Sequence, residues 1–160
     1  MSEHRATVRW DRNSSDFLRG RYSREHTWTF DGGAVVAASP SPSLVPAPYS
    51  NRANVDPEEA YVAAISSCHM LTFLYLASRH GFQIDSYVDE AMGVITKDAS
   101  GMAWISSVTL HAKVACSGAK EVTATEIDRL HHEAHEQCFI ASSIRTEVTV
   151  RSEVNWVAAP

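Results

Sequence analysis

The sequence has no basic block, no apolar run approaching 18 uninterrupted residues and only three cysteines. Its formal net charge of −5 argues against nucleic acid and anionic membranes as partners. The lack of a long apolar run argues against a membrane-spanning segment. An odd cysteine count, with no signal-peptide pattern at the N-terminus, favours reduced thiols in a cytoplasmic protein over a disulfide framework.

What the sequence does contain is typical of one α+β domain. A chain of 160 residues that is 44% hydrophobic is long enough to form its own core, so we expect a single domain over residues 1–160. Residues 39–55 are rich in proline, serine and asparagine, and a loop of this length is usually functional or wraps another part of the protein. The expected order is strands at 6–10 and 25–38, a helix, strands at 84–97 and 103–116, a second helix and a strand at 144–151.

The first helix has a clear start and stop. Asp56 is a good N-cap and Glu59 completes a capping box. The helical pattern runs to His80, and Gly81 favours a stop there. Because residues 60–77 are apolar on nearly every side, the sequence predicts a buried central helix.

Two cysteines lie in two different helical contexts. Cys68 lies about three turns into the first helix. Cys138 ends the apolar stripe of a second helix that begins at Thr123. A thiol on an apolar surface can be shielded from water and still meet another thiol, so that one sulfur attacks an oxidant and the other captures the sulfenic acid. The alternative for both is a core thiol that packs like a small hydrophobe, as we expect for Cys116 on the inward face of the strand at 103–116.

A reactive thiolate at Cys68 would need a nearby cation. The residue lies too deep in its helix for the N-terminal partial charge to favour the thiolate. His69 points about 100° away around the helix, so it cannot easily supply the charge. An arginine from the N-terminal strands is the better candidate.

The second helix also raises the question of a metal. His131, His135 and Cys138 lie roughly on one face and could hold zinc with a fourth ligand. The segment nearly matches a metalloprotease motif but fails it, because the i+4 partner of His132 is Glu136 rather than histidine. We favour a solvated polar face, and we expect no metal and no other cofactor.

One combination of features resembles a known family. The start Asp56-Pro57-Glu58, ten residues before Cys68 in a long apolar helix, and a second cysteine at the end of a later helix resemble the OsmC/Ohr superfamily. These are the osmotically inducible and organic hydroperoxide resistance proteins, and the resemblance covers residues 6–151. It implies an OsmC/Ohr-like fold, with antiparallel sheets around a long central buried helix, in an intertwined homodimer.

The resemblance also implies a cysteine-based peroxidase. Cys68 would be the attacking cysteine and Cys138 the resolving one, with an organic hydroperoxide as substrate and a dithiol as reductant. Apolar neighbours of Cys68, namely Ala64, Ile65 and Leu71, suit an organic hydroperoxide better than hydrogen peroxide.

A glutamate and an arginine complete the site that the resemblance implies. Glu58 matches the glutamate of the family's Pro-Glu motif, and Arg24 is the best match for the arginine, with Arg21 and Arg19 as alternatives. About 15 Å of helix separates Glu58 from Cys68, so a second subunit at the site would most simply let an arginine join both.

The sequence departs from the family at two places. Phe139 follows the second cysteine where members often carry proline, and Ser67 and His69 flank Cys68 in place of more apolar surroundings. These departures indicate a divergent branch. Two other functions stay open. One is a ligand-binding or redox-sensing protein of the same fold without turnover, and the other is a zinc-binding protein that uses Cys138 and the histidines of the second helix.

Overall fold

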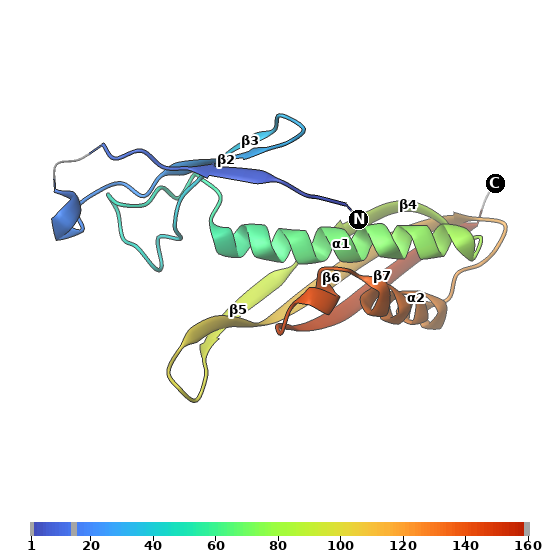
Figure 1. Cartoon of the computed structure of the whole chain (residues 1–160). Coiled ribbons are helices and arrows are strands. Elements are labelled where there is room, and N and C mark those ends of the chain that lie inside the picture. The colour runs from blue at the N-terminus through green and yellow to red at the C-terminus, as the bar shows by residue number, and fades with distance from the viewer. Residues whose placement is uncertain (1, 14–15, 159–160) are drawn as a thin grey trace. The chain divides into compact units, whose positions relative to one another are not determined.

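The computed structural model describes residues 2–13 and 16–158, and the chain divides into two compact units, residues 1–60 and 61–160 (Figure 1). Helix α1 begins at the end of the first unit and continues into the second. The expectation of a single domain over residues 1–160 stays a prediction.

The first unit is built on a three-stranded antiparallel sheet. Its strands are β1 (Ala6–Arg9), β2 (His26–Phe30) and β3 (Val35–Ala38), and a short 3-10 helix, η1 (Phe17–Arg19), lies between β1 and β2. The tight turn between β2 and β3 uses Gly33, whose φ of +86° suits glycine. These strands confirm the predicted segments at 6–10 and 25–38. Among the strand residues only Ala38 is buried, so this sheet has no core of its own.

The loop at 39–55 is tied back to this sheet. The backbone N–H of Ser39 donates to the carbonyl of Val55 at 3.0 Å. The side chains of Asn51 and Asn54 donate to the carboxylate of Glu25 at 2.8 and 3.2 Å. The loop therefore returns the chain to the end of β3 just before α1 begins.

Helix α1 (Pro57–Arg79) has the predicted capping box. The N–H of Glu59 donates to Asp56 Oδ1 at 2.7 Å, and the N–H of Asp56 donates to Glu59 Oε2 at 3.1 Å. Gly81, with a φ of +76°, follows the last turn. By length and composition alone α1 could cross a membrane, which is weak evidence because core helices of soluble proteins pass the same test.

Helix α1 is buried on one side only, not on nearly every side as its composition predicts. Its opposite side carries Leu71 and Tyr75, which are 61% and 60% exposed. An apolar side chain is buried only where another element covers it. Composition alone does not say how many sides of a helix are covered. The buried positions are Ile65, His69, Phe73, Leu76 and Ala77.

The sheet of the second unit is centred on the long strand β6 (Ala103–Gly118). Strands β4 (Gln83–Asp89) and β5 (Met92–Lys97) pair antiparallel with it, and their registers follow one another along the same edge. Strand β7 (Glu147–Ala158) pairs with β6 in parallel along the other edge. The parallel pair departs from the purely antiparallel sheets expected, and it arises because helix α2 crosses over between β6 and β7.

Two strand boundaries also differ from the prediction. The segment 84–97 is interrupted at Glu90 and Ala91, where Asp89 Oδ1 accepts the backbone N–H of His111 at 2.7 Å in place of a backbone partner. The closing strand begins at Glu147 rather than at 144 and continues to 158.

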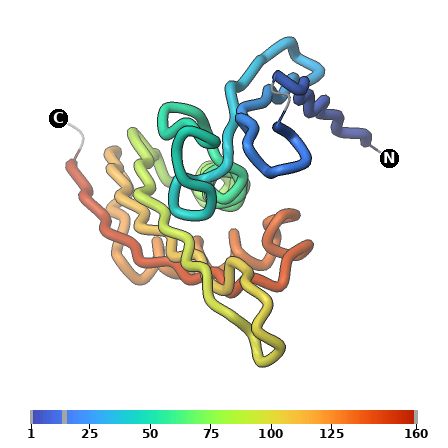
Figure 2. The backbone as a smooth tube through the Cα atoms, turned by 90° about the vertical axis from the view of Figure 1, so that its left-hand side faces the viewer, coloured from blue at the N-terminus to red at the C-terminus, as the bar shows by residue number. Residues whose placement is uncertain are grey.

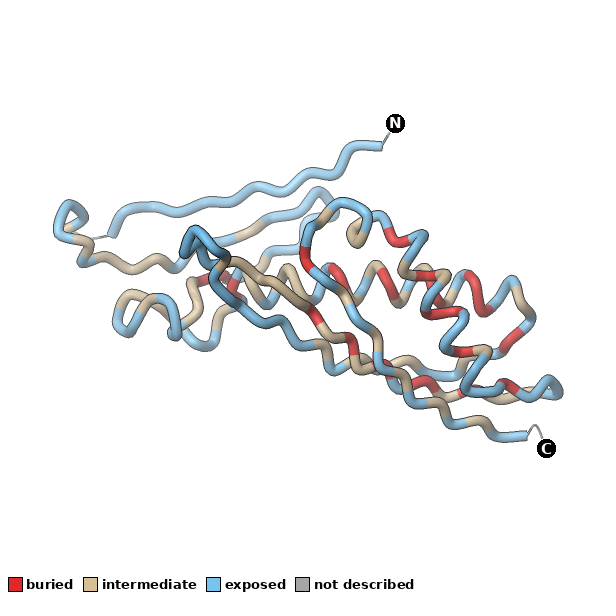
Figure 3. Tube along the Cα trace, turned by 90° about the horizontal axis from the view of Figure 1, so that it is seen from below, coloured by how far each residue is buried: buried red, intermediate tan, exposed pale blue. Residues whose placement is uncertain are grey.

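Both helices of the second unit cover the same face of the sheet (Figures 1 and 2). Helix α2 (Ala124–Gln137) is followed by a short 3-10 helix, η2 (Ala141–Ser143). As predicted, alternate residues of β6 face this core, and the apolar stripe of α2 packs onto it (Figure 3). The buried residues on β6 are Val108, Leu110, Ala112, Val114 and Cys116, and those on the stripe are Ile127, Leu130, Ala134 and Cys138.

Candidate functional site

Two of the three thiols meet in the second unit. The Cys138 thiol at the end of α2 donates to Cys68 Sγ on α1, with 2.8 Å between the sulfur atoms. All three cysteines carry free thiols. Cys116 lies in the core, only 1% exposed, in agreement with its predicted packing role.

The two thiols in contact have different environments. Cys68 is partly exposed, whereas Cys138 is fully buried and accepts the backbone N–H of Ala141 at 3.5 Å. Burial, and then the hydrogen bond to Cys68, raise the pKa of the Cys138 thiol, so it is protonated at neutral pH. The pair therefore has one sulfur that a reactant can reach and one that is shielded and neutral.

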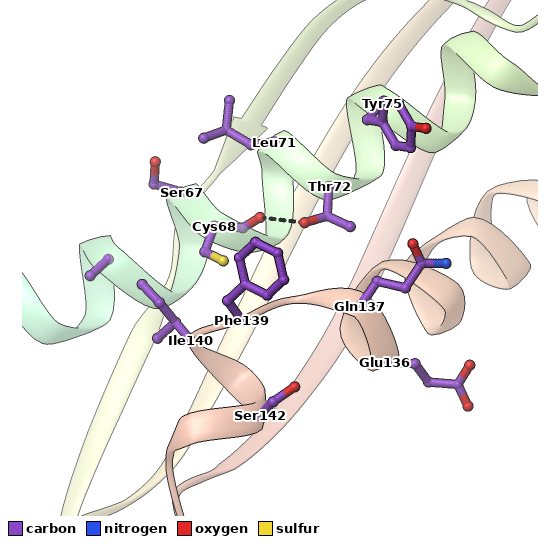
Figure 4. Close-up of a pocket in the computed structure, with 11 residues that line it drawn as sticks. Ser67, Cys68, Leu71, Thr72, Tyr75, Glu136, Gln137, Phe139, Ile140 and Ser142 are labelled. Carbon is purple, nitrogen blue, oxygen red and sulfur yellow. Dashed lines mark hydrogen bonds between the residues drawn. The ribbon is translucent and has the colours of Figure 1, made fainter. Parts of the chain in front are cut away.

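A pocket of about 870 Å³ opens beside Cys68 (Figure 4). Phe139, the residue after the buried cysteine, is 86% exposed at this pocket. Ile65, which the sequence analysis placed beside Cys68, packs instead with Val108 and Leu110 in the core. The surface that lines the pocket is mostly apolar. The lining residues are Ala64, Ser67, Cys68, Leu71, Thr72 and Tyr75 of α1, together with Glu136, Gln137, Phe139, Ile140 and Ser142.

On the inner side of α1, two histidines form a buried pair. The ring nitrogens His69 Nε2 and His131 Nδ1 are 2.9 Å apart, and the two rings are nearly parallel at 7°. His69 is 1% exposed and His131 is 3% exposed, and burial is the main cause that lowers the pKa of each to about 4. Both rings are therefore neutral at neutral pH. His69 does not supply the positive charge that a Cys68 thiolate needs.

Two of the three side chains considered for zinc have other partners. Cys138 contacts Cys68, and His131 bonds to His69. Over residues 2–13 and 16–158, no group of three or more histidine, cysteine, aspartate or glutamate side chains is placed to hold a metal ion.

A carboxylate fixes α1 to the sheet close to the thiols. The hydroxyl of Ser66 donates to Asp89 Oδ2 at 2.5 Å, two residues before Cys68, and the other oxygen of Asp89 holds the N–H of His111. Sequence reasoning missed both this contact and the His69–His131 pair. The only available signal for the pair was the spacing of seven residues from His131 to Cys138, which puts both on one face of α2.

Arg24 and Glu58 belong to the first unit, and their place beside the thiols stays a prediction. The guanidinium of Arg24 donates to the carbonyl of Tyr22 at 3.2 Å and lies 4.2 Å from the centre of the Tyr22 ring. Arg24 is partly buried, whereas Arg19 and Arg21 are exposed. Glu58 Oε2 is buried without a hydrogen-bond partner among the described residues.

Comparison with known proteins gives the family of this thiol-pair protein. A profile of the OsmC-like protein family matches residues 50–153. An OsmC-like protein of unknown function from Vibrio cholerae is 48% identical, with a TM-score of 0.92 over 96% of this chain and 100% of that one. No curated protein sequence matches. The chain belongs to the OsmC-like protein family, which confirms the resemblance seen in the sequence.

More distant structures share the fold. An organic hydroperoxide resistance protein from Elizabethkingia anophelis is 19% identical, with a TM-score of 0.71 over 98% of both chains. The organic hydroperoxide resistance protein OhrB of Bacillus subtilis is also 19% identical, with a TM-score of 0.60 over 96% of this chain and 98% of that one. These structures confirm the predicted α+β, OsmC/Ohr-like fold.

The buried histidines predict acid sensitivity. An unfolded histidine has a pKa near 6.5, and the folded pKa of His69 and His131 is about 4. Between these values the unfolded chain binds more protons, so stability falls as the pH falls from 6.5 to 4. We expect each histidine to account for about 2 kcal/mol, and the pair for about 4 kcal/mol, of lost unfolding free energy between pH 7 and pH 5, measured by urea denaturation.

Other titratable groups near the histidine pair also respond to pH, so the prediction is tested by comparing variants that keep these groups. Tyr87 and Asp89 face it from β4, and Asp128 and His135 face it from α2. These carboxylates are present in every variant compared. The double variant His69→Phe/His131→Phe should lose most of the difference between pH 7 and pH 5. His132→Asn, at an exposed histidine of α2, should keep it, and equal slopes in all three proteins would contradict the prediction.

Proposed function

We propose that the chain is a thiol-dependent peroxidase that reduces organic hydroperoxides to alcohols in the cytoplasm. The observation that carries the proposal is the contact between Cys68 and Cys138 beside a mostly apolar pocket. The family supports it, because proteins of the same fold are named for organic hydroperoxide resistance.

The chemistry divides between the two sulfurs. The Cys68 thiolate attacks one oxygen of the hydroperoxide, the O–O bond breaks, and one proton taken up gives Cys68 sulfenic acid and an alcohol. The Cys138 thiol then attacks the sulfenic sulfur, which releases water and forms the Cys68–Cys138 disulfide. A dithiol reduces this disulfide to two thiols and becomes a disulfide itself. Partial exposure of Cys68 and burial of Cys138 suit this order.

Cysteine variants test the proposal. Cys68→Ser should abolish consumption of cumene hydroperoxide in a dithiol-coupled assay. Without the dithiol, Cys138→Ser should consume about one equivalent and leave Cys68 as a sulfenic acid that mass spectrometry detects, where the wild type forms the disulfide. Cys116→Ser is the matched control and should keep near wild-type turnover. Near wild-type activity of Cys68→Ser would sink the proposal, and oxidation without turnover in the wild type would favour a redox-sensing protein instead.

Arg24 and Glu58 complete the proposed site. A guanidinium beside Cys68 would favour the thiolate by opposite charge, and it would also hold the peroxide and stabilise the leaving oxygen. The buried, unpartnered Glu58 Oε2 supports this arrangement, because a buried carboxylate oxygen is costly without a donor such as an arginine.

Arginine variants test this assignment. Arg24→Ala should shift the alkylation of Cys68 to higher pH and slow the attack on peroxide at least about tenfold. Arg24→Lys should restore only part of the rate, because a lysine lacks the planar fork of a guanidinium. Arg19→Ala and Arg21→Ala are the matched controls. An unchanged profile in Arg24→Ala with a shifted profile in either control would move the role to that neighbour.

A homodimer is the proposed working form. The outer side of α1 exposes Leu71 and Tyr75, and the sheet of the first unit buries only Ala38 among its strand residues. A second copy that covers these apolar surfaces would supply the burial that each chain lacks. It would also allow one subunit to contribute an arginine to the site of the other.

Light scattering across a wide concentration range tests the dimer. We expect the mass of two chains at micromolar concentration, with activity and folded structure lost together on dilution. Leu71→Lys, on the exposed side of α1, should weaken the dimer, whereas Lys97→Ala on β5 should not. A stable, fully active monomer at micromolar concentration would contradict both the dimer and the shared site.

A further inference from the structure

The two helices that carry the reactive thiols are joined by a second side-chain contact. In the described part of the chain, α1 and α2 share two side-chain hydrogen bonds, the one between the thiols and the one between His69 and His131. His69 is the residue after Cys68. His131 lies about two turns before Cys138, on the same face of α2. Each histidine is therefore rigidly connected to one of the two thiols.

The histidine pair has one preferred geometry. Its rings meet edge to edge in nearly one plane, and His131 stacks on Phe73 with 4.3 Å between ring centres. Both rings are neutral, so the 2.9 Å contact requires one ring to donate and the other to accept. Such a bond is directional, unlike apolar packing, and it fixes how far α2 can slide along α1.

The end of α2 needs this restraint. Cys138 is the C-cap residue, and the next residue, Phe139, is 86% exposed. A disulfide requires its sulfur atoms to approach to about 2.05 Å with a defined dihedral angle, so a small displacement of α2 removes the productive geometry. Misplacement of reacting groups by about 1 Å can cost on the order of 100-fold in rate.

The geometry points to the His69–His131 pair as the positioning element for disulfide formation. It holds the end of α2 so that Cys138 reaches Cys68, and it sets the rate and the equilibrium of the Cys68–Cys138 disulfide. The first attack of Cys68 on a hydroperoxide does not depend on it. The biological use of the disulfide rests on the proposed function, but its formation can be measured without any peroxide.

The test measures the effective concentration of the two thiols, which is the equilibrium constant for forming the Cys68–Cys138 disulfide from oxidised glutathione. The protein carries Cys116→Ser and is equilibrated with reduced and oxidised glutathione, then quenched with acid, alkylated and analysed by mass spectrometry. The informative variant is His69→Leu/His131→Leu, which removes the hydrogen bond and replaces each ring by an apolar side chain of similar volume. Replacing both partners by apolar groups of similar shape is nearly neutral for stability, so a pair that only packs would be replaced without effect.

The expected result is a fall in effective concentration of at least about tenfold in the double variant. In single-turnover experiments with cumene hydroperoxide, disulfide formation should slow by a similar factor, and formation of the sulfenic acid should change less than about threefold. His80→Gln is the matched control, because His80 follows the end of α1, about three turns past His69, and its ring lies 3.6 Å from Glu133 of α2. It should change neither quantity by more than about threefold.

An effective concentration in the double variant within about threefold of the parent overturns the inference, whatever the peroxidase activity. If peroxide is not consumed but the effective concentration falls as expected, the proposed function fails and the inference stands. If the double variant does not fold by circular dichroism, the comparison moves to His131→Asn, whose amide lies near the Nδ1 position, and His131→Leu. The asparagine variant should keep the effective concentration and the leucine variant should lose it, and equal values in the two overturn the inference.

Discussion

The second unit depends on the contact between one side of α1 and alternate residues of β6. Ile65 packs on Val108 and Leu110, and Phe73 and Ala77 pack in the cluster that contains Val114 and Cys116. This contact settles which side of α1 faces the core. Cys68 lies about 60° around the helix from Ile65, at the edge of the packed side, where it reaches both Cys138 and the pocket.

The same contact leaves a chemical asymmetry around the helix. Inward from Cys68 lies a neutral, fully buried histidine pair, and outward lies a mostly apolar pocket with exposed aromatic side chains. Within the second unit, the described residues around the thiols therefore lower the polarity of the site rather than supply positive charge. A cation that stabilises the thiolate would come from outside this packed core. Arg24, which the family resemblance suggests for this role, lies in the first unit.

Local signals in the sequence predicted local structure well. The capping boxes at Asp56 and Thr123, the alternation along β6 and the apolar stripe of α2 each depend on neighbours in the chain, and the structure confirms them. The two cysteines were found because each lies on an apolar helical surface. The sequence did not predict the one-sided burial of α1, because an apolar composition does not show how many sides of the helix other elements cover.

Contacts between distant segments were the ones that sequence reasoning could not supply. The parallel pairing of β7 with β6, the bond from Ser66 to Asp89 and the His69–His131 pair each join residues at least 23 positions apart. A lone serine or histidine in a sequence is compatible with many environments, and only the fold selects its partner. The pocket beside Cys68 has the same origin, because its lining comes from two segments that meet only in the folded unit.

The parallel pairing also determines when the site can exist. Strand β7 ends at Ala158, beside Gly118 of β6, so the sheet is complete only when the residues up to 158 are present. Pairing over such sequence distances is slow, because the chain between the strands must be closed first. Helix α2, with Cys138 at its end, lies in that connection. A chain emerging from the ribosome therefore carries Cys68 without a fixed partner until β7 has been made, and the thiol pair forms late in the folding of the second unit.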